Sequence, residues 1–284
     1  MAIDRVVYTN SAVDIKSAVT ASVAVRLDTV QNATYTVNVP RENVNTLGAK
    51  GTVFRPQLDA ADASIEFSLI PAVSGSPDWS PSVANAYITN CLAQDPTTDD
   101  AEVQALGLGQ VDDALMNSLT AEATVGAMAN MTVSFTGAPA TGAPPAALTS
   151  PGSITTLTLV QSKDVTVADG TFKSACVQSA STAWDVPVVN VLCLGGDPTD
   201  PTDIHPFGNP PGTASHTIEG LDTALRHNAS TGNTATDYTL SIGMFDFKLA
   251  GGFVDSETNS VAVGDVFATF NYVIGGTGDS FTIS

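Results

Sequence analysis

The segment from Asp197 to His205 holds the side chains best suited to chemistry in this sequence. Asp197, Asp200 and Asp203 are evenly spaced along it, and His205 follows closely. Carboxylate oxygens and an imidazole nitrogen are ligands for hard or borderline divalent cations. However, two prolines stiffen the run, and it lacks the glycine turn of an EF-hand loop. We therefore favour a solvated acidic loop and keep these four residues as a weak candidate for a metal site.

Nucleophilic catalysis has few candidate residues. The three histidines, His205, His216 and His227, all lie in the second half of the chain, and no Gly-x-Ser-x-Gly segment is present to carry a serine nucleophile. Cys193 with His216 would be a thiol dyad, but Cys193 lies in an apolar run, where an activated thiolate is not expected. A carbohydrate-active enzyme needs paired carboxylates in an aromatic-lined cleft, and only 6% of the residues are aromatic. We therefore predict no catalytic residues, no cofactor and no enzymatic activity.

Strands must position most of these residues, because apolar and polar residues alternate along much of the chain. Residues 83–92 are the clearest helix, because their apolar positions fall at helical spacing after Ser80-Pro81. Short helices are also expected at 101–106 and 219–228, and long loops at 41–61 and 195–212. Strands are expected near 3–9, 18–28, 33–39, 62–70, 120–125 and 131–135, and near 153–161, 163–168, 172–179, 186–194, 213–218, 237–249, 252–262 and 265–274.

A repeated segment divides the chain into two similar parts. Asn43-Val-x-x-Leu-Gly returns as Asn190-Val-x-x-Leu-Gly, in each case after an apolar run and before a polar loop. Residues 138–152 are rich in Pro, Gly and Ala and have the composition of a linker. The sequence thus predicts a mainly β protein with two similar β-sandwich or partial-barrel domains, 1–137 and 153–284, each with a flanking short helix. Two unrelated β domains that share turn residues are the alternative.

The charge balance excludes a protein that holds nucleic acid tightly. The 284 residues include 10 Lys and Arg against 29 Asp and Glu, for a net charge of −19. Affinity for nucleic acid depends largely on basic side chains, so DNA near this protein would be repelled. The N-terminal residues resemble no signal peptide, no run is long enough for a membrane span, and three cysteines make no even disulfide framework. These features predict a product made in the cytoplasm, with no membrane partner.

The long loop after the expected strand 33–39 carries the most specific motif. Its sequence is Arg41-Glu42-Asn43-Val44-Asn45-Thr46-Leu47-Gly48, followed by Lys50-Gly51 and Phe54-Arg55 and then by the expected strand 63–69. Three of the ten cations of an acidic chain lie in this loop, and clustered cations of this kind are expected to meet carboxylates of a neighbour. We predict that Arg41, Glu42, Lys50 and Arg55 make contacts between subunits.

In this motif, and in the closing segment from Ser118 to Phe135, the chain resembles the tail tube proteins of long-tailed (siphovirus-type) bacteriophages. The resemblance implies a structural virion protein of the tail, made in the host cytoplasm, whose rings stack into a conduit for DNA ejection. It also implies contacts with other tail proteins and with passing DNA, without specific DNA binding. If each chain supplies two tube domains, the ring is a trimer with pseudo-sixfold symmetry; with one per chain, it is a hexamer.

Two other classes stay open at this point. A head-decoration or tail-completion protein is the nearest alternative among virion proteins. A bacterial surface β-module would share the composition rich in Ser, Thr and Asn, but it should carry a signal peptide.

Overall fold

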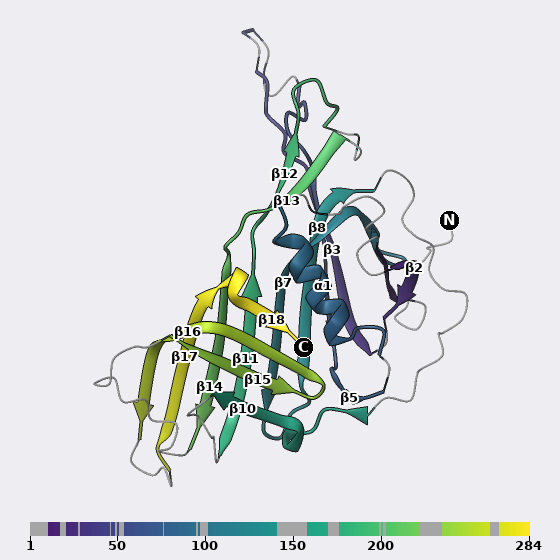
Figure 1. The fold of residues 1–284 in the computed structure, drawn as a ribbon. Helices are drawn as coiled ribbons and strands as arrows, with labels where there is room; N and C mark the ends of the chain where they lie inside the picture. Colours follow the sequence, from purple (N-terminus) through teal and green to yellow (C-terminus); the bar gives the residue numbers. More distant parts are fainter. Residues whose placement is uncertain are drawn as a thin grey trace.

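The computed structural model describes residues 11–17, 21–27, 29–45, 47–48, 50, 54–75, 77–94, 96, 102–140, 158–169, 176–198, 200, 203–221, 235–261 and 267–284. The protein is mainly β, as the sequence predicts, and most of its strands belong to one large antiparallel sheet (Figure 1). Within the described residues, the single α-helix is α1 (Pro81–Cys91), and no helix has the length and apolar character needed to cross a membrane.

The first half of the chain contributes one part of this sheet, in the order β3-β4-β8-β7-β6-β1-β2. Its longest strand, β7, pairs with β6 over its first residues and with β8 along most of its length. The strands are β1 (Val13–Ser17), β2 (Ala21–Arg26), β3 (Val30–Asn38), β4 (Asp62–Leu69), β6 (Glu102–Ala105), β7 (Gly109–Thr124) and β8 (Asn130–Pro139).

The second half contributes the other part, in the order β11-β14-β17-β16-β15-β10, with β18 added to β16. Its longest strand, β16, pairs with β15 and β18 before Phe253 and with β17 from Phe253 onward. The strands are β10 (Val165–Asp169), β11 (Val177–Asp185), β14 (Thr213–Gly220), β15 (Thr236–Ile242), β16 (Phe245–Ser260), β17 (Thr269–Thr277) and β18 (Phe281–Ile283).

The two parts join where β7 pairs with β11. The register runs from Ser118 opposite Asp185 to Thr124 opposite Ser179, so the sheet continues from the first half of the chain into the second. The shorter pairs are β5 (Ala72–Ser74) with β9 (Thr158–Leu159), and β12 (Val188–Leu192) with β13 (Ile204–Gly208). Two 3-10 helices, η2 (Ser162–Asp164) and η6 (Gly278–Ser280), complete the described elements.

α1 begins where the sequence predicts it, because Ser80 caps it and Pro81 occupies its first turn. The backbone N–H of Val83 donates to Ser80 Oγ at 3.4 Å, and this satisfies one of the amides that lack a partner at a helix start. The apolar side of α1 packs on the sheet, where the rings of Tyr87 and Phe135 meet edge to face at 5.2 Å. In the second half, the largest fully buried side chains include Trp184 and Tyr272.

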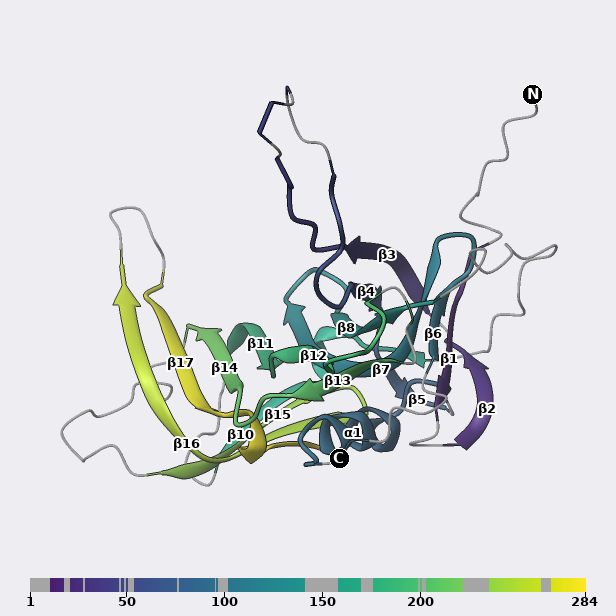
Figure 2. The same ribbon diagram turned by 90° about the horizontal axis from the view of Figure 1, so that it is seen from above.

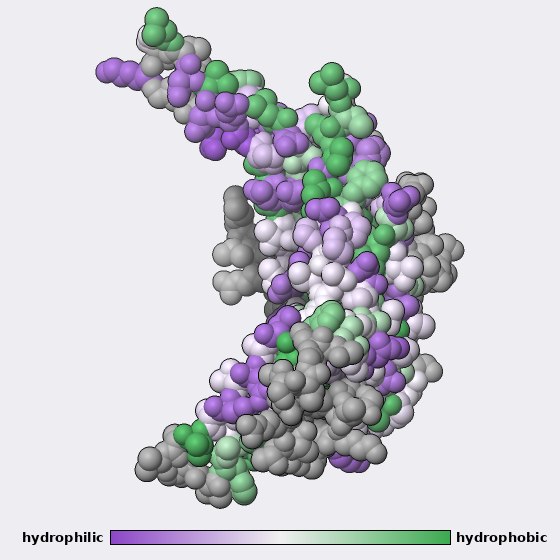
Figure 3. Space-filling model, turned by 60° about the vertical axis from the view of Figure 1, so that its left-hand side comes forward, coloured by the Kyte–Doolittle hydropathy of each residue, from purple (hydrophilic) through white to green (hydrophobic). Residues whose placement is uncertain are grey.

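The sheet is curved. Figure 2 shows α1 and the C-terminus on its convex side, whereas a projecting arm (Arg41–Gln57) points away from the opposite side. In the space-filling view the molecule has a crescent outline, and this arm forms its upper tip (Figure 3). The face of the sheet opposite α1 is therefore its concave face.

Several sequence predictions differ from this fold or lie outside the described residues. Residues 102–105 form strand β6 rather than a helix, because Val103 and Ala105 alternate with half-buried polar neighbours. β8 runs to Pro139 and so extends into the predicted linker 138–152, most of which lies outside the described residues. Residues 219–220 belong to β14, and the rest of the helix predicted at 219–228, apart from Leu221, lies outside the described residues, as does the strand predicted at 3–9.

Candidate assembly surfaces

From β3 across to the second half of β16, the concave face of the sheet is polar and its strands carry no positive charge, whereas β1 and β2 carry Lys16 and Arg26 in ion pairs with carboxylates. On the side of α1, residues such as Ile65, Phe67 and Phe135 are fully buried, so the alternate residues of the same strands point to the concave side. These alternate residues are mostly Ser and Thr, with the carboxylates of Glu66, Glu122 and Glu219 among them. In β3, β4, β7, β8, β11, β14, β17 and the second half of β16, no residue is Lys or Arg.

Two strand edges of the curved sheet, that of β3 and that of the second half of β16, have no strand partner among the described residues. β3 pairs only with β4, and most of its residues are exposed. From Phe253 to Ser260, β16 pairs only with β17, and most of this segment is exposed too. By contrast, β11 lies between β7 and β14, and only its last residue, Asp185, is exposed. Unpaired strand edges present rows of free backbone donors and acceptors and are templates for pairing with another chain.

The arm 41–57 extends β3 and β4 beyond the sheet (Figure 1). It is a narrow hairpin with two bridges, Arg41 to Gln57 and Val44 to Phe54, and Arg41 Nη1 donates to the carbonyl oxygen of Arg55 at 3.2 Å. The four predicted contact residues, Arg41, Glu42, Lys50 and Arg55, all lie exposed on this arm. Leu47 is fully exposed and Phe54 is 63% exposed, so the arm buries little apolar surface within its own chain.

The hairpin β12–β13 occupies the corresponding place after β11, but it packs on the first half of the same chain. Asn190 Nδ2 donates to the Asp62 carboxylate at 2.9 Å and to the carbonyl oxygens of Gly137 and Ala61 at 3.0 and 3.3 Å. Ile204 is buried against Ala60 and Ala138. A side chain at Gly208 would collide with the Cys91 carbonyl at the end of α1, so glycine permits this close approach.

The acidic run after β12 does not assemble a metal site. Asp203 Oδ2 accepts a hydrogen bond from the backbone N–H of Asp197 at 2.8 Å, and turn bonds link Asp197, Asp200 and Asp203 through their backbones. His205 is exposed on β13, opposite Val191. Across the described parts of the chain, no three or more His, Cys, Asp or Glu side chains form a group that could hold a metal ion.

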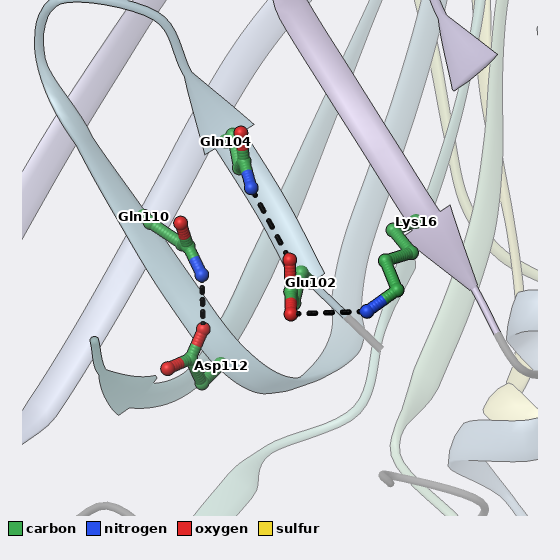
Figure 4. Close-up of polar contacts among 5 residues, drawn as sticks. All are labelled: Lys16, Glu102, Gln104, Gln110 and Asp112. Atoms are coloured by element: carbon green, nitrogen blue, oxygen red, sulfur yellow. Dashed lines mark hydrogen bonds and ion pairs between the residues drawn. The ribbon is translucent and has the colours of Figure 1, made fainter. Parts of the chain in front are cut away.

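A second polar cluster lies where β1, β6 and β7 meet (Figure 4). Lys16 Nζ and Gln104 Nε2 each contact the Glu102 carboxylate at 3.2 Å, and Gln110 Nε2 donates to Asp112 at 2.6 Å. Burial raises the pKa of Asp112, and the hydrogen bond from Gln110 opposes this effect. The cluster consists of an ion pair and two amides that satisfy the carboxylates, and it includes neither an imidazole nor a thiol. Its arrangement supports a structural role at this end of the sheet.

The structure does not bring the residues of the possible thiol dyad together. Cys193 is exposed in the turn after β12, whereas His216 is 1% exposed on β14. Burial lowers the pKa of His216 to about 4, so its imidazole is neutral at pH 7. Both tryptophans, Trp79 and Trp184, are core residues.

Sequence reasoning missed the two free edges and the contact of Asn190 with the first half of the chain. The only sequence signal for these features is the repeated Asn-Val-x-x-Leu-Gly segment, which places Asn190 and Asn43 at equivalent points. No known protein family matches this chain, and no curated protein has significant sequence similarity to it.

Proposed function

We propose that this chain is the major tail tube subunit of a long-tailed bacteriophage: a structural protein whose two halves are copies of one β domain and which closes into stacked rings. The observation that carries the proposal is the junction between β7 and β11. It joins the two halves through two strand edges, and the equivalent edges of β3 and of the second half of β16 have no strand partner within the described chain.

The strand order and registers support a duplicated domain. The order β3-β4-β8-β7 in the first half corresponds to β11-β14-β17-β16 in the second. β3 and β11 have the same length, as do β4 and β14. When β3 is aligned with β11 and β4 with β14 without gaps, each residue pair of the first hairpin falls on a residue pair of the second. Thus Val30 opposite Leu69 corresponds to Val177 opposite Gly220.

The same alignment extends to the next strand. Leu69 opposite Met131 of β8 corresponds to Gly220 opposite Phe270 of β17, and the pairs that follow along both strands also correspond. One unit used twice accounts for this agreement, which unrelated β domains have no reason to share.

The irregularities recur at the same positions, which is stronger support than regular pairing. The register of β7 breaks between Met116 and Ser118, and that of β16 breaks at the equivalent step, between Val254 and Ser256. The gapless alignment that places Met116 on Val254 also places Asp113 on Gly251. Both of these residues have positive φ, at 50° and 63°. Bulges and left-handed residues are specific features of a strand, so their coincidence supports common descent of the two halves.

Ring closure follows from the junction. Within one chain, the edge of β7 from Ser118 to Thr124 pairs with β11. The equivalent edge of β16 and the equivalent strand β3 have no strand partner there in the described chain, so β16 of one copy would pair with β3 of the next. In the alignment above, Thr258 would lie opposite Thr36 of the neighbour, as Thr120 lies opposite Ala183. Three of the facing pairs, Ser256 with Asn38, Thr258 with Thr36 and Ser260 with Thr34, would join small, uncharged polar side chains, which suit such a contact.

The number of chains in a ring can be estimated from strand geometry. Each chain would contribute eight strands to the wall, β3, β4, β8, β7, β11, β14, β17 and β16. At about 4.8 Å between strands and a tilt of about 40°, three chains would give a wall of about 24 Å radius, and two chains about 16 Å. After about 5 Å of side chain on each side, two chains leave a channel about as narrow as a DNA duplex, roughly 20 Å. Three chains are the smallest number that leaves clearance.

The concave face would then line the channel. Its Ser and Thr residues and its three glutamates offer no basic side chain to DNA phosphates. Since attraction to DNA comes largely from Lys and Arg, a wall of this kind lets a duplex pass without being held.

A covalent cross-link tests the proposed ring edge. Thr36→Cys and Thr258→Cys are introduced together after the exposed Cys176 and Cys193 are changed to Ser, while buried Cys91 is kept. Mild oxidation of the assembled protein should give dimers and trimers on a non-reducing gel, and the ladder should end at three chains. Each single substitution can give at most a dimer.

Thr34→Cys with Ser256→Cys is the matched control, because these positions lie on the same two edges but out of register. It should give little cross-linking. Tubes that form normally but yield no Thr36–Thr258 cross-link would rule out this edge, and a ladder that continues to six chains would rule out the trimer.

A further inference from the structure

We propose that the arm 41–57 of each chain docks on the second half of a neighbouring copy, in the position that β12–β13 takes on the first half of its own chain. This inference rests on the proposed duplication and ring, and it assigns a partner and a binding mode to an arm that buries little within its own chain.

The two hairpins have the same register. Arg41 opposite Gln57 corresponds to Val188 opposite Gly208, and Val44 opposite Phe54 corresponds to Val191 opposite His205. These correspondences need no new alignment. When the gapless alignment of β3 with β11 and of β4 with β14 is continued into the two hairpins, it matches each of these residues with its counterpart. The arm 41–57 is therefore equivalent to β12–β13. Unlike β12–β13, it does not pack, over its described residues, on a β domain of its own chain.

That surface exists on the second half of the chain. Asn190 donates to Ala61, Asp62 and Gly137, whose equivalents are Gly212, Thr213 and Gly276. Thr213 is exposed, and Gly212 and Gly276 are partly exposed. Asn43, the equivalent of Asn190, is exposed on the arm. Because Gly137 and Gly276 hold the same place in their strand pairs, the carbonyl oxygen that accepts from Asn190 has a counterpart in Gly276, to which Asn43 would donate.

The equivalence also sorts the predicted contact residues into two faces. In β12, Val188, Asn190 and Leu192 are half-buried against the first half, whereas Val189 and Val191 are exposed. Their equivalents place Arg41, Asn43 and Asn45 toward the neighbouring copy and Glu42 away from it. Arg55 corresponds to Pro206, which is buried, so it faces the neighbour as well.

The receiving surface is acidic at its border. Asp279 follows β17 in η6 and is exposed, and Asp255 is exposed on β16, beside Gly275. Two arginines arriving from a neighbouring arm would meet opposite charge there, while uncharged Thr213 and Gly276 would meet Asn43. A second copy of this chain thus matches the arm in both hydrogen bonding and charge.

Cross-linking distinguishes this docked position from any other. In the background with Cys176 and Cys193 changed to Ser, Asn43→Cys with Thr213→Cys should link different chains when the protein assembles. The matched pair Asn190→Cys with Asp62→Cys should link residues of one chain and leave its molecular mass unchanged, because these side chains already meet at 2.9 Å.

Asn43→Ala and Asn190→Ala provide an independent readout. Asn190→Ala should lower the melting temperature of the unassembled chain, because it removes three hydrogen bonds. Asn43→Ala should leave that temperature unchanged and raise the concentration needed for assembly about tenfold. Glu42→Ala should change neither property.

The proposal is overturned if Asn43→Ala assembles like the unaltered protein and the Asn43–Thr213 cross-link is absent while the Thr36–Thr258 cross-link forms. If both interchain cross-links are absent from assembled protein, the ring edge fails as well, and with it the proposed function. The two experiments therefore separate a misplaced arm from a wrong ring.

Discussion

His216 is expected to make the stability of this protein depend on pH between about 6.5 and 4. The imidazole is 1% exposed, it lies opposite Thr182 of β11 and Ile274 of β17, and its ring centre is 6.2 Å from that of Phe281. Burial lowers the pKa of His216 from 6.5 to about 4, and the nearby backbone of Tyr238 offsets only part of this effect. No charged side chain is among these neighbours to stabilise an imidazolium.

The sign of the effect follows from the two pKa values. Between about pH 6.5 and pH 4 the unfolded chain binds a proton at this position and the folded chain does not, so acid favours unfolding. The full contribution of His216 is present above pH 6.5 and decreases as the pH falls toward 4. A shift of this size corresponds to about 3 kcal/mol in total, of which about 2 kcal/mol is lost between pH 7.5 and pH 5.

The measurement is urea denaturation at several pH values for the unaltered chain and for His216→Leu, which keeps an apolar side chain of similar size in the core. Other titrating groups act equally in both proteins, so the difference between the two curves isolates His216. That difference should change by about 2 kcal/mol from pH 7.5 to pH 5. Parallel curves would refute the reasoning, since they would mean that His216 titrates alike in the folded and unfolded states.

Three further predictions concern the bend, the arm and the acidic run. Gly251→Val should lower the free energy of unfolding by about 1–2 kcal/mol, because Gly251 has positive φ, although there is open space around the position. Gly251→Asn should lower it by less, because asparagine tolerates positive φ. Equal losses for the two variants in urea denaturation would contradict this account of the bend. Arg41→Glu with Arg55→Glu should prevent assembly but leave the melting temperature of the single chain unchanged, with Glu42→Gln as control; electron micrographs with normal tubes would argue against the docked arm. Chelation of divalent cations should leave the melting temperature unchanged, whereas a fall of more than about 3 °C, roughly 1 kcal/mol for a chain of this size, would point to a metal near Asp197.

The elements predicted correctly from the sequence are those whose signals are local. Ser80 and Pro81 marked the start of α1, and alternation of Ala63, Ile65 and Phe67 with polar neighbours marked β4. The prediction at 102–105 was wrong because four residues cannot separate a strand from a helix by periodicity alone. β7 was predicted much too short because its alternation breaks at Asp113, where the strand bends.

Features that depend on long-range pairing were not predictable in the same way. Nothing local in β11 indicates that it pairs with β7, because a strand at an edge and a strand inside a sheet can have the same alternation. The repeated Asn-Val-x-x-Leu-Gly segment did indicate two related halves, but the matching bulges and registers become visible only once the partners are known. Arg41 and Arg55 were chosen for their charge, whereas Asn43 gained its proposed role from the contacts of Asn190.

The central claim is that three chains, each with two equivalent wall domains, close one ring. Cryo-electron microscopy of assembled tubes measures this directly by counting chains in each ring. The account predicts three chains, with β16 of each chain paired with β3 of the next in a continuous wall of strands around the channel. Rings of six chains, with the second half of each chain outside the wall, would contradict it.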